Sequence, residues 1–326
     1  MQTIELAGTG RRTTRLGFGC SSIMGGMGRK QSLVVLEWAF DAGLRHYDVA
    51  PMYGFGAAES CLGEFLKQHR GEVTVTTKFG IPATKNTAWI NMARALARPL
   101  VKLAPVLKAR AQRAANTVSA APAERNLSPA EAERSLNHSL QQLRIERIDV
   151  FLLHDATPGE VRNDALLEFL ERAKQAGKIG NFGVGTDRDH MTGILRDAPA
   201  YASVVQQEWS VFDPVESGGT FHIHHRSLAH NRTRLQEYLY QHAETAARWS
   251  AEVGADLRQP QVLSTLMMRA ALLANPAGIV LFSSKSREHI QINAALAEPS
   301  GANLQAAALH CIVQREAGAI QGGPKS

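Results

Sequence analysis

Residues 44–60 read LRHYDVAPMYGFGAAES, and the fold prediction starts from this stretch. LRHYDVA is a short apolar run typical of a strand, and Pro51, Gly54 and Gly56 then break the pattern. The next stretch, AAESCLGEFLKQH (57–69), has the apolar spacing of a helix. The run ends near Asp48, and Tyr53 lies in the broken loop. Loops on rigid scaffolds often carry functional residues, so both side chains are candidates; a helix-capping aspartate and a packing tyrosine are the alternative.

The same alternation of strand and helix recurs along the chain. RIDVFLLH (147–154) is nearly continuous in apolar residues, as in a strand buried on both faces. SPAEAERSLNHSLQQL (128–143) opens with a capping box ahead of a helix, and RTRLQEYLYQHAETAARWSAEVG (232–254) has the pattern of one long helix. Eight strand–helix units can be counted, the weakest helix following VVQQEWS, and they predict a (β/α)₈ TIM barrel. A doubly wound sheet is the alternative, but no G-x-G-x-x-G opens a helix after a strand.

We expect a single barrel domain over residues 1–326 with two additions. The leading MQTIELAGTGRR predicts a hairpin with Gly8 and Gly10 at its turn. The segment 81–127, interrupted by Pro99, Pro105 and Pro122, is inserted between the third strand and the third helix. That position predicts an insertion over the C-terminal mouth of the barrel, where active sites of this fold occur.

The inserted segment also explains the basic charge of the chain. Residues 85–113 hold seven Lys or Arg and no acid, and removing those seven charges from the net charge of +6 leaves −1. A charge footprint for nucleic acid over the whole body is therefore absent, and we expect no nucleic-acid partner. The segment could lie on an anionic membrane surface, contact a partner, or pack on its own barrel. Our hypothesis is that it shapes the substrate pocket.

Composition indicates an ordinary globular protein. The chain has 326 residues, of which 44% are hydrophobic and 20% charged, and no apolar run has the length of a membrane span. Cys20, Cys61 and Cys311 are far apart and have no metal-ligand spacing, so each is expected as a buried thiol. The N-terminus lacks the layout of a signal peptide, and the expected location is the cytoplasm. The oligomeric state is left open.

Four polar residues follow successive predicted strands. Asp48 and Tyr53 follow the second strand, Lys78 ends the third in VTVTTKFG, and His154 ends the fourth. In a barrel these positions converge. A lysine cation beside the Tyr53 phenol stabilises phenolate, Asp48 can keep Lys78 charged, and an imidazole can hydrogen-bond a carbonyl oxygen. A solvated lysine and a core histidine are the alternatives for Lys78 and His154.

These residues and the pattern D-x-x-x-x-Y-G-x-x-x-x-E, here DVAPMYGFGAAE (48–59), resemble the aldo-keto reductase family over residues 14–80 and 128–297. The resemblance implies a (β/α)₈ barrel in which Asp48, Tyr53, Lys78 and His154 form the catalytic group. It further implies that NAD(P)H delivers hydride to the carbonyl carbon of a small aldehyde or ketone while Tyr53 protonates the oxygen. The reverse reaction would oxidise an alcohol.

The resemblance also implies a set of cofactor contacts. A helix N-terminus with nearby cations, including Arg287, suits a 2′-phosphate, so NADPH is expected and NADH is left open. Two departures stand out: Gly185-Thr186 replaces the family's usual Ser-Asn pair, and His225 replaces the aromatic residue that stacks on nicotinamide. The cofactor-binding candidates are Gly19, Cys20, Ser21, Asp48, Gly185, Thr186, Gln206, His225, Ser283, Ser284, Lys285, His289 and Asn293.

Two other interpretations were weighed. The cluster His222, His224 and His225 could suggest a metal, but no carboxylate or cysteine has ligand spacing beside it, so no metal is expected. A nicotinamide-binding regulatory subunit without catalysis is the alternative function. The departures at Gly185-Thr186 and His225 leave it open, whereas the complete group of four catalytic candidates argues against it. A hydrophobic substrate pocket is expected from the apolar residues Ile23, Met24, Met27, Phe55, Trp209 and Phe212.

Overall fold

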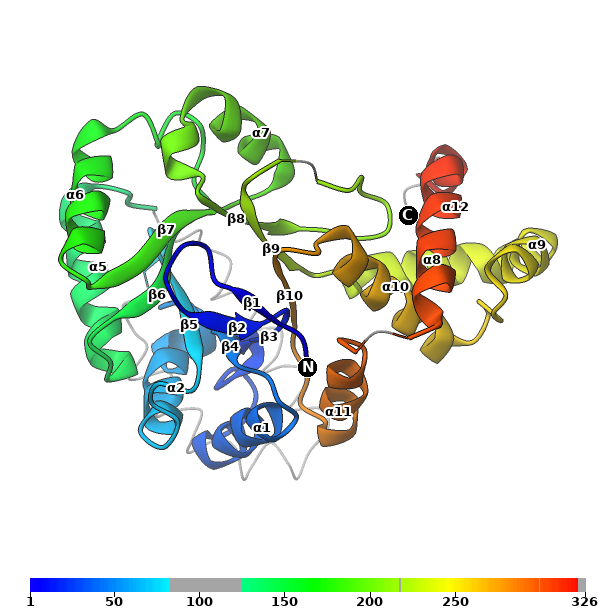
Figure 1. Ribbon diagram of the computed structural model, residues 1–326, viewed down its shortest axis with the longest axis horizontal. Coiled ribbons are helices and arrows are strands. Elements are labelled where there is room, and N and C mark those ends of the chain that lie inside the picture. Colours follow the sequence, from blue (N-terminus) through cyan, green and yellow to red (C-terminus); the bar gives the residue numbers. More distant parts are fainter. Residues whose placement is uncertain (83–124, 217, 299, 322–326) are drawn as a thin grey trace, which may run out of the picture.

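The computed structural model describes residues 1–82, 125–216, 218–298 and 300–321, and its centre is a closed barrel (Figure 1). Eight parallel strands pair in the order β10-β3-β4-β5-β6-β7-β8-β9, which confirms the predicted barrel. The strands are β3 (Leu16–Gly19), β4 (His46–Asp48), β5 (Thr74–Phe79), β6 (Ile148–His154), β7 (Ile179–Gly185), β8 (Val204–Glu208), β9 (Phe221–His225) and β10 (Ile279–Phe282).

Helices surround the barrel. The predicted cap is confirmed, because Ser128 accepts a hydrogen bond from the backbone N–H of Glu131 at 3.3 Å and Pro129 is the first residue of its helix. Among the described residues, no helix has both the length and the apolar character needed to cross a membrane. The helices are α1 (Arg29–Asp41), α2 (Ala58–Leu66), α5 (Pro129–Leu143), α6 (Asp164–Gln175), α7 (Arg188–Asp197), α8 (Ala229–Gln241), α9 (Ala243–Val253), α10 (Pro260–Ala274), α11 (Arg287–Ala295) and α12 (Ala302–Gln321), with short 3₁₀ turns η1 (Cys20–Ser22), η2 (Tyr53–Gly56) and η3 (Pro199–Tyr201).

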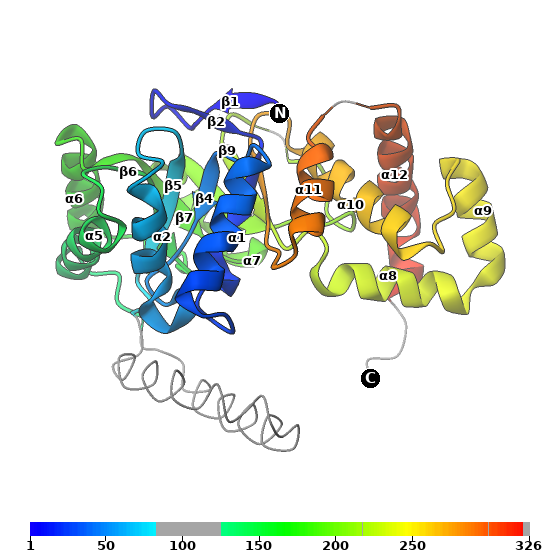
Figure 2. The ribbon, with the colours of Figure 1, turned by 90° about the horizontal axis from the view of Figure 1, so that it is seen from below.

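The structure differs from the sequence prediction on one side of the barrel. No helix is present in the described residues between β8 and β9, where the helical pattern of the sequence is weakest. The helix expected over 232–254 is broken at His242 into α8 and α9, and α10 and α12 were not anticipated. Helices α8, α9, α10 and α12 gather on this side, with α9 and α12 far from the barrel axis (Figures 1 and 2).

The expected hairpin closes the N-terminal end of the barrel. Strands β1 (Thr3–Glu5) and β2 (Arg12–Thr14) pair antiparallel, and Gly8 and Gly10 have φ of 71° and 74° in the turn, as glycine allows. Figure 2 shows the hairpin lying across one end of the strands. Beneath it lies a separate apolar cluster, consisting of Leu6, Val150, Leu152, Val204, Ile223, Ile279 and Leu281. With this end plugged, the opposite end is the one available for a site.

The predicted insertion at 81–127 lies mostly outside the described residues, which omit 83–124. Its two ends are described, and they meet directly after β5. The backbone N–H of Asn126 donates to the carbonyl of Gly80 at 2.9 Å. The segment therefore leaves and rejoins the barrel at one point at the C-terminal ends of the strands, and its proposed place over the mouth stays a prediction.

Candidate active site

The structure brings the four predicted catalytic residues together at the C-terminal end of the strands. Asp48 is the last residue of β4, Lys78 lies near the end of β5, and His154 is the last residue of β6. The Lys78 Nζ donates to Asp48 Oδ1 at 2.7 Å and lies 5.1 Å from the centroid of the Tyr53 ring. The Tyr53 and His154 rings meet edge to face with centroids 6.3 Å apart.

Tyr53 reaches this cluster because its loop turns sharply. It is the first residue of η2, and the next two residues, Gly54 and Phe55, both have positive φ, 58° and 57°. A Cβ on Gly54 would lie 2.5 Å from the carbonyl oxygen of Ile23 and 2.6 Å from the Cβ of Met24. Only glycine lets the two loops approach so closely, so Gly54 fixes where the phenol projects.

The Asp48–Lys78 ion pair is buried. The two residues are 4% and 2% exposed, and Lys78 also donates to the carbonyl of Val49 at 3.2 Å. Burial alone would lower the pKa of Lys78, but Asp48 and Tyr53 favour its charged form, and the pKa of Lys78 is raised. The lysine is therefore a fixed cation beside the phenol at any physiological pH.

The pKa of Tyr53 departs from the sequence expectation. Lys78 lowers the pKa of the phenol, as predicted, but burial raises it by more, and Asp48 raises it further, so the pKa of Tyr53 stands above its ordinary value. The effect of Lys78 on the phenol is therefore present, but burial outweighs it. The consequence is that Tyr53 carries its proton at neutral pH, as a proton donor must.

Two histidines at the site are neutral. Burial, helped by Lys78, lowers the pKa of His154 to about 3, and burial lowers the pKa of His225 to about 4. The His154 Nδ1 is buried and has no hydrogen-bond partner among the described residues. A neutral imidazole next to the phenol can hydrogen-bond a substrate oxygen without competing as an acid.

Gln206 of β8 has a partner that the sequence did not reveal. Its Nε2 donates to Asp48 Oδ2 at 2.7 Å, from a side chain 3% exposed. Gly185 pairs with it across β7 and β8, and a Cβ on Gly185 would lie 3.3 Å from Gln206 Oε1. The following Thr186 is buried, and its Oγ1 is without a partner in the described part of the chain. A buried hydroxyl without a partner is a candidate for a ligand contact.

The predicted cofactor residues near β3 and β10 lie on two touching loops. The Ser283 Oγ donates to the carbonyl of Gly19 at 2.6 Å, and a Cβ on Gly19 would lie 2.8 Å from that hydroxyl. Ser21 is exposed, whereas Cys20 is fully buried, so any ligand contact of Cys20 would come from its backbone. Because position 19 is glycine, the last residue of β3 and the first residue after β10 can lie in direct contact at the C-terminal end of the barrel.

The start of α11 gathers cations. Ser286, which the sequence analysis passed over, caps this helix by accepting the backbone N–H of His289 at 3.3 Å. Lys285 and Arg287 flank the cap, and Ser284 lies just before Lys285. Asn293 lies on the same helix, one turn beyond His289. Free N–H groups at a helix start together with basic side chains fit a phosphate. The residues at the start of α11 therefore fit the phosphate of a nucleotide cofactor.

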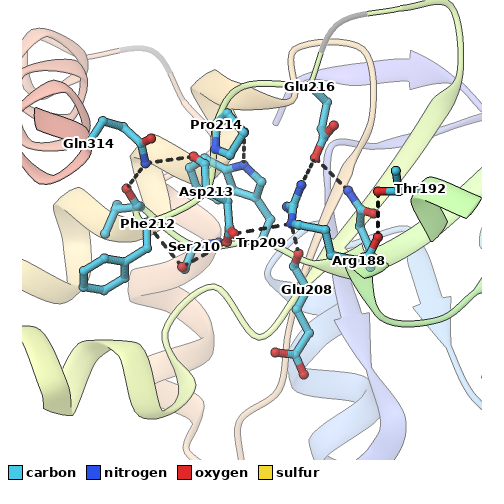
Figure 3. A network of polar contacts seen from close by, with 12 residues as sticks. Arg188, Thr192, Glu208, Trp209, Ser210, Phe212, Asp213, Pro214, Glu216 and Gln314 are labelled. Carbon is cyan, nitrogen blue, oxygen red and sulfur yellow. Dashed lines mark hydrogen bonds and ion pairs between the residues drawn. The ribbon is translucent and has the colours of Figure 1, made fainter. Parts of the chain in front are cut away.

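The expected hydrophobic pocket is wrong in part. Ile23, Met27 and Trp209 are 0%, 3% and 0% exposed, so they cannot line an open pocket. Trp209 instead lies outside the barrel, where its Nε1 donates to the carbonyl of Pro214 at 2.9 Å (Figure 3) and its ring stacks on His224 at 5.6 Å. Met24, Phe55 and Phe212 are partly exposed.

The histidine cluster is divided between two faces of β9. His224 stacks on Trp209 on the outer side, and its ring lies 5.8 Å from that of His222. His225 lies on the inner side, where the charges of Asp48 and Lys78 affect its pKa. Within the described ranges, no three or more His, Cys, Asp or Glu side chains are grouped so as to hold a metal ion.

Comparison with known proteins agrees with this geometry. The model described as "Aldo/keto reductase family" matches residues 15–231. The "Aldo-keto reductase yakc [NADP(+)]" of Schizosaccharomyces pombe is 29% identical over 60% of this chain and 49% of that protein. The "Pyridoxal 4-dehydrogenase" of Microbacterium luteolum is 25% identical over 64% of this chain and 63% of that protein. The matched part of the chain thus spans 49% and 63% of the length of these two relatives.

Solved structures resemble the fold over nearly the whole chain. The glycerol dehydrogenase from Gluconobacter oxydans has a TM-score of 0.67 at 19% identity and covers 96% of this chain and 95% of its own. An aldo-keto reductase from Klebsiella pneumoniae in complex with NADPH has a TM-score of 0.62 at 21% identity, with 96% of each chain covered. At these identities the likeness supports the fold alone.

Proposed function

The chain belongs to the aldo/keto reductase family, and on that premise we propose that it is a nicotinamide-dependent oxidoreductase that interconverts a small carbonyl compound and its alcohol. The observation that carries this proposal is the buried group at the barrel mouth: Lys78 Nζ is 2.7 Å from Asp48 and lies beside the Tyr53 ring, with His154 against the same ring. A phenol, a fixed cation and a neutral imidazole facing one space can protonate an oxygen as negative charge develops on it.

Each residue has a defined task in this scheme. When bound, the reduced nicotinamide supplies the hydride that adds to the carbonyl carbon. Tyr53 gives its proton to the carbonyl oxygen, and the Lys78 cation stabilises the phenolate that remains. Asp48 keeps Lys78 charged and in place, and the neutral His154 donates a hydrogen bond to the substrate oxygen. In the reverse direction the phenolate takes the proton of the alcohol.

We propose NADPH as the preferred form of the cofactor. Lys285 and Arg287 lie beside the cap of α11, where a 2′-phosphate would meet both the helix N-terminus and two cations. Thr186 Oγ1 and Gln206 Oε1 would hold the carboxamide, and His225 would face the nicotinamide ring. The relative from Schizosaccharomyces pombe carries NADP(+) in its name, which supports the same choice.

The decisive experiment is NADPH oxidation with a panel of aldehydes and ketones. We expect Tyr53→Phe to lower kcat by about 10²- to 10⁴-fold, because the proton donor is lost, while the Kd for NADPH stays close to that of the native chain. Tyr240→Phe is the matched control, since Tyr240 is 78% exposed on α8. Tight NADPH binding without turnover of any substrate by the native chain would instead favour a non-catalytic, nicotinamide-binding role.

The cofactor preference has its own test. We expect Lys285→Ala to weaken binding of NADPH about tenfold and to leave NADH binding unchanged, because one charged hydrogen bond to the 2′-phosphate is lost. Lys178→Ala, which removes an exposed lysine between α6 and β7, is the control. Equal weakening of both cofactors would show that Lys285 contacts a group that NADH shares.

A further inference from the structure

We propose that Gln206 is a positioning residue that holds the carboxylate of Asp48 against Lys78 from the opposite wall of the barrel. This inference rests on the proposed function, because it concerns the acid–base group of the same site. The family resemblance assigned Gln206 to the carboxamide of the cofactor. The hydrogen bond to Asp48 gives Gln206 a second partner, inside the protein itself.

Both oxygens of Asp48 are engaged, each by a different strand. Oδ1 accepts from Lys78 Nζ and Oδ2 accepts from Gln206 Nε2, both at 2.7 Å. Because a carboxylate only accepts, Gln206 must turn its NH₂ toward Asp48 and its Oε1 away. The terminal torsion of an aspartate is soft, so one hydrogen bond leaves the carboxylate plane free to rotate. Two bonds from different directions fix that plane.

The hydrogen bond between Gln206 and Asp48 crosses the barrel. In the closed order of strands, β4, which carries Asp48, and β8, which carries Gln206, are four steps apart in either direction and so face each other. The three side chains of Asp48, Lys78 and Gln206 are 4%, 2% and 3% exposed. Among the residues described, no other side chain is seen to donate to Oδ2, and the pair is only 4% and 2% exposed, so Gln206 is the group that restrains this oxygen.

Gly185 makes room for this arrangement. It pairs with Gln206 across β7 and β8, and a Cβ there would lie 3.3 Å from Gln206 Oε1, closer than ordinary contact. The serine expected at this position from the family resemblance would press on the amide. With glycine, Nε2 reaches Asp48 and no Cβ at position 185 crowds Oε1. One amide can then serve Asp48 and a ligand at the same time.

The hydrogen bond between Gln206 and Asp48 has an electrostatic consequence that can be measured. The negative charge of Asp48 raises the pKa values of both Tyr53 and Lys78. These two groups titrate as a coupled pair, so the pH at which the pair loses its first proton depends on how closely Asp48 is held. If Asp48 is released, that apparent pKa falls.

The test is the pH profile of carbonyl reduction. We expect Gln206→Met to move the alkaline limb of kcat to lower pH by about one unit, the scale of one hydrogen bond to a charged group. The Kd for NADPH should rise as well, because the amide that would hold the carboxamide is removed, and the pH shift is the readout that tests the bond to Asp48. The control is Gln207→Met, which alters the neighbouring amide on the outer face of β8, bonded to Glu216 at 2.8 Å. Its pH profile should match that of the native chain.

Two further variants keep the test decisive. Gln206→Asn retains an amide but withdraws it by one methylene, and should shift the profile in the same direction if Gln206→Met does not fold. In an Asp48→Asn background, Gln206→Met should produce no additional shift, because the partner is gone. An unchanged profile in the single variants would overturn the proposal, whether or not NADPH binding is weakened.

A readout without turnover separates this inference from the proposed function. The ultraviolet absorbance of tyrosinate, taken as the difference between a chain and the same chain carrying Tyr53→Phe, follows the ionisation of Tyr53 alone. We expect Gln206→Met to lower this titration midpoint as well. A shifted midpoint in a protein that reduces no carbonyl would overturn the proposed function only, whereas turnover with an unshifted midpoint would overturn the role of Gln206.

Discussion

Gln206 and Gln207 are consecutive residues of β8, equally buried at 3% exposure, yet they belong to two different regions of the molecule. Because side chains alternate along a strand, Gln206 faces the barrel interior and donates to Asp48 at 2.7 Å, whereas Gln207 faces outward and donates to Glu216 at 2.8 Å. Each amide supports a carboxylate that also pairs with a cation, Lys78 inside and Arg188 outside. The local chemistry is the same on the two faces.

The difference lies in the surroundings. On the outer face, Arg188 and Glu216 have side chains 34% and 23% exposed, and Arg188 also meets Asp213 at 3.4 Å (Figure 3). This network fastens the loop that stands in place of a helix between β8 and β9. On the inner face the ion pair is almost inaccessible to solvent. Water can replace a lost partner outside but not inside, so equal contacts should have unequal energies.

The largest expected effect comes from breaking the inner pair. Asp48→Ala should lower the free energy of unfolding by about 3–5 kcal/mol, because it leaves the Lys78 ammonium buried without a counter-charge. Urea unfolding measures this loss. The double variant Asp48→Leu with Lys78→Met should recover much of the stability, since no charge is then buried. A loss below 1 kcal/mol in the single variant would mean that water enters the barrel interior.

Two buried histidines sharpen the comparison of the inner and outer faces. His46, inside the barrel, bonds the hydroxyls of Thr74 and Thr76 at 3.0 and 3.2 Å. His224, outside, stacks on Trp209, and neither of its ring nitrogens has a partner in the described part of the chain. Burial lowers the pKa of His46 to about 4 and that of His224 to about 3. Both resist protonation, but only His46 gains hydrogen bonds in return.

The second expected effect follows from His224 and depends on pH. Its pKa in the folded chain lies below the unfolded value, so its contribution to stability is complete above pH 6.5 and is lost as the pH falls toward 3. At pH 5 the loss is about 2 kcal/mol. His224→Phe keeps a ring on Trp209 and cannot be protonated. The free energy of unfolding of this variant, measured in urea, should therefore fall less between pH 7 and pH 5 than that of the native chain.

The matched substitution on the inner face, His46→Phe, should instead lower the free energy of unfolding already at neutral pH. His46→Phe removes the imidazole that bonds the buried Thr76 hydroxyl, whereas Thr74 keeps another hydroxyl and a backbone carbonyl as partners. We expect the substitution to destabilise the fold by about 1–3 kcal/mol at neutral pH. Stability measured in urea at pH 7 distinguishes the two variants. If both variants lost the same free energy of unfolding at this pH, the imidazole of His224 would have to make a favourable contact that phenylalanine cannot replace.

The barrel and its four-residue cluster were predictable because local patterns encode them. Apolar runs ending in Asp48, Lys78 and His154 identify strands, and parallel strands place their carboxyl ends on one rim whatever lies between them. The Ser128 cap was equally local and is confirmed. Such features need only the periodicity of a few residues and the rule that the strands of a barrel are parallel.

What the sequence did not reveal depends on contacts between distant residues. The hydrogen bond from Gln206 to Asp48 joins positions 158 residues apart, and no local pattern announces it. The net pKa of Tyr53 depends on how deeply the loop is buried, which opposes the visible effect of Lys78. Helices α10 and α12 pack on each other beside the barrel, outside the repeating unit that guided the prediction.

The inserted segment can be tested through its ends. Asn126 and Gly80 are hydrogen-bonded, so joining residue 82 to residue 125 by a short glycine linker should leave the barrel intact. We expect this deletion to change the order of substrate preference in kcat/KM while the Kd for NADPH stays close to native. Loss of NADPH binding with unchanged substrate preference would contradict a role at the substrate pocket.

The smallest expected effect is on the outer face of β8. Gln207→Met removes one hydrogen bond to Glu216, whose carboxylate keeps its contact with Arg188 at 2.6 Å. Since a partly exposed carboxylate with a remaining cation is not left unpaired, the free energy of unfolding should fall by only about 1 kcal/mol. The kcat for carbonyl reduction should not change, because β8 keeps its inner face and Asp48 keeps Gln206. If kcat fell along with stability, the outer network would be supporting the site through the strand, and the separation of the two faces would be incomplete.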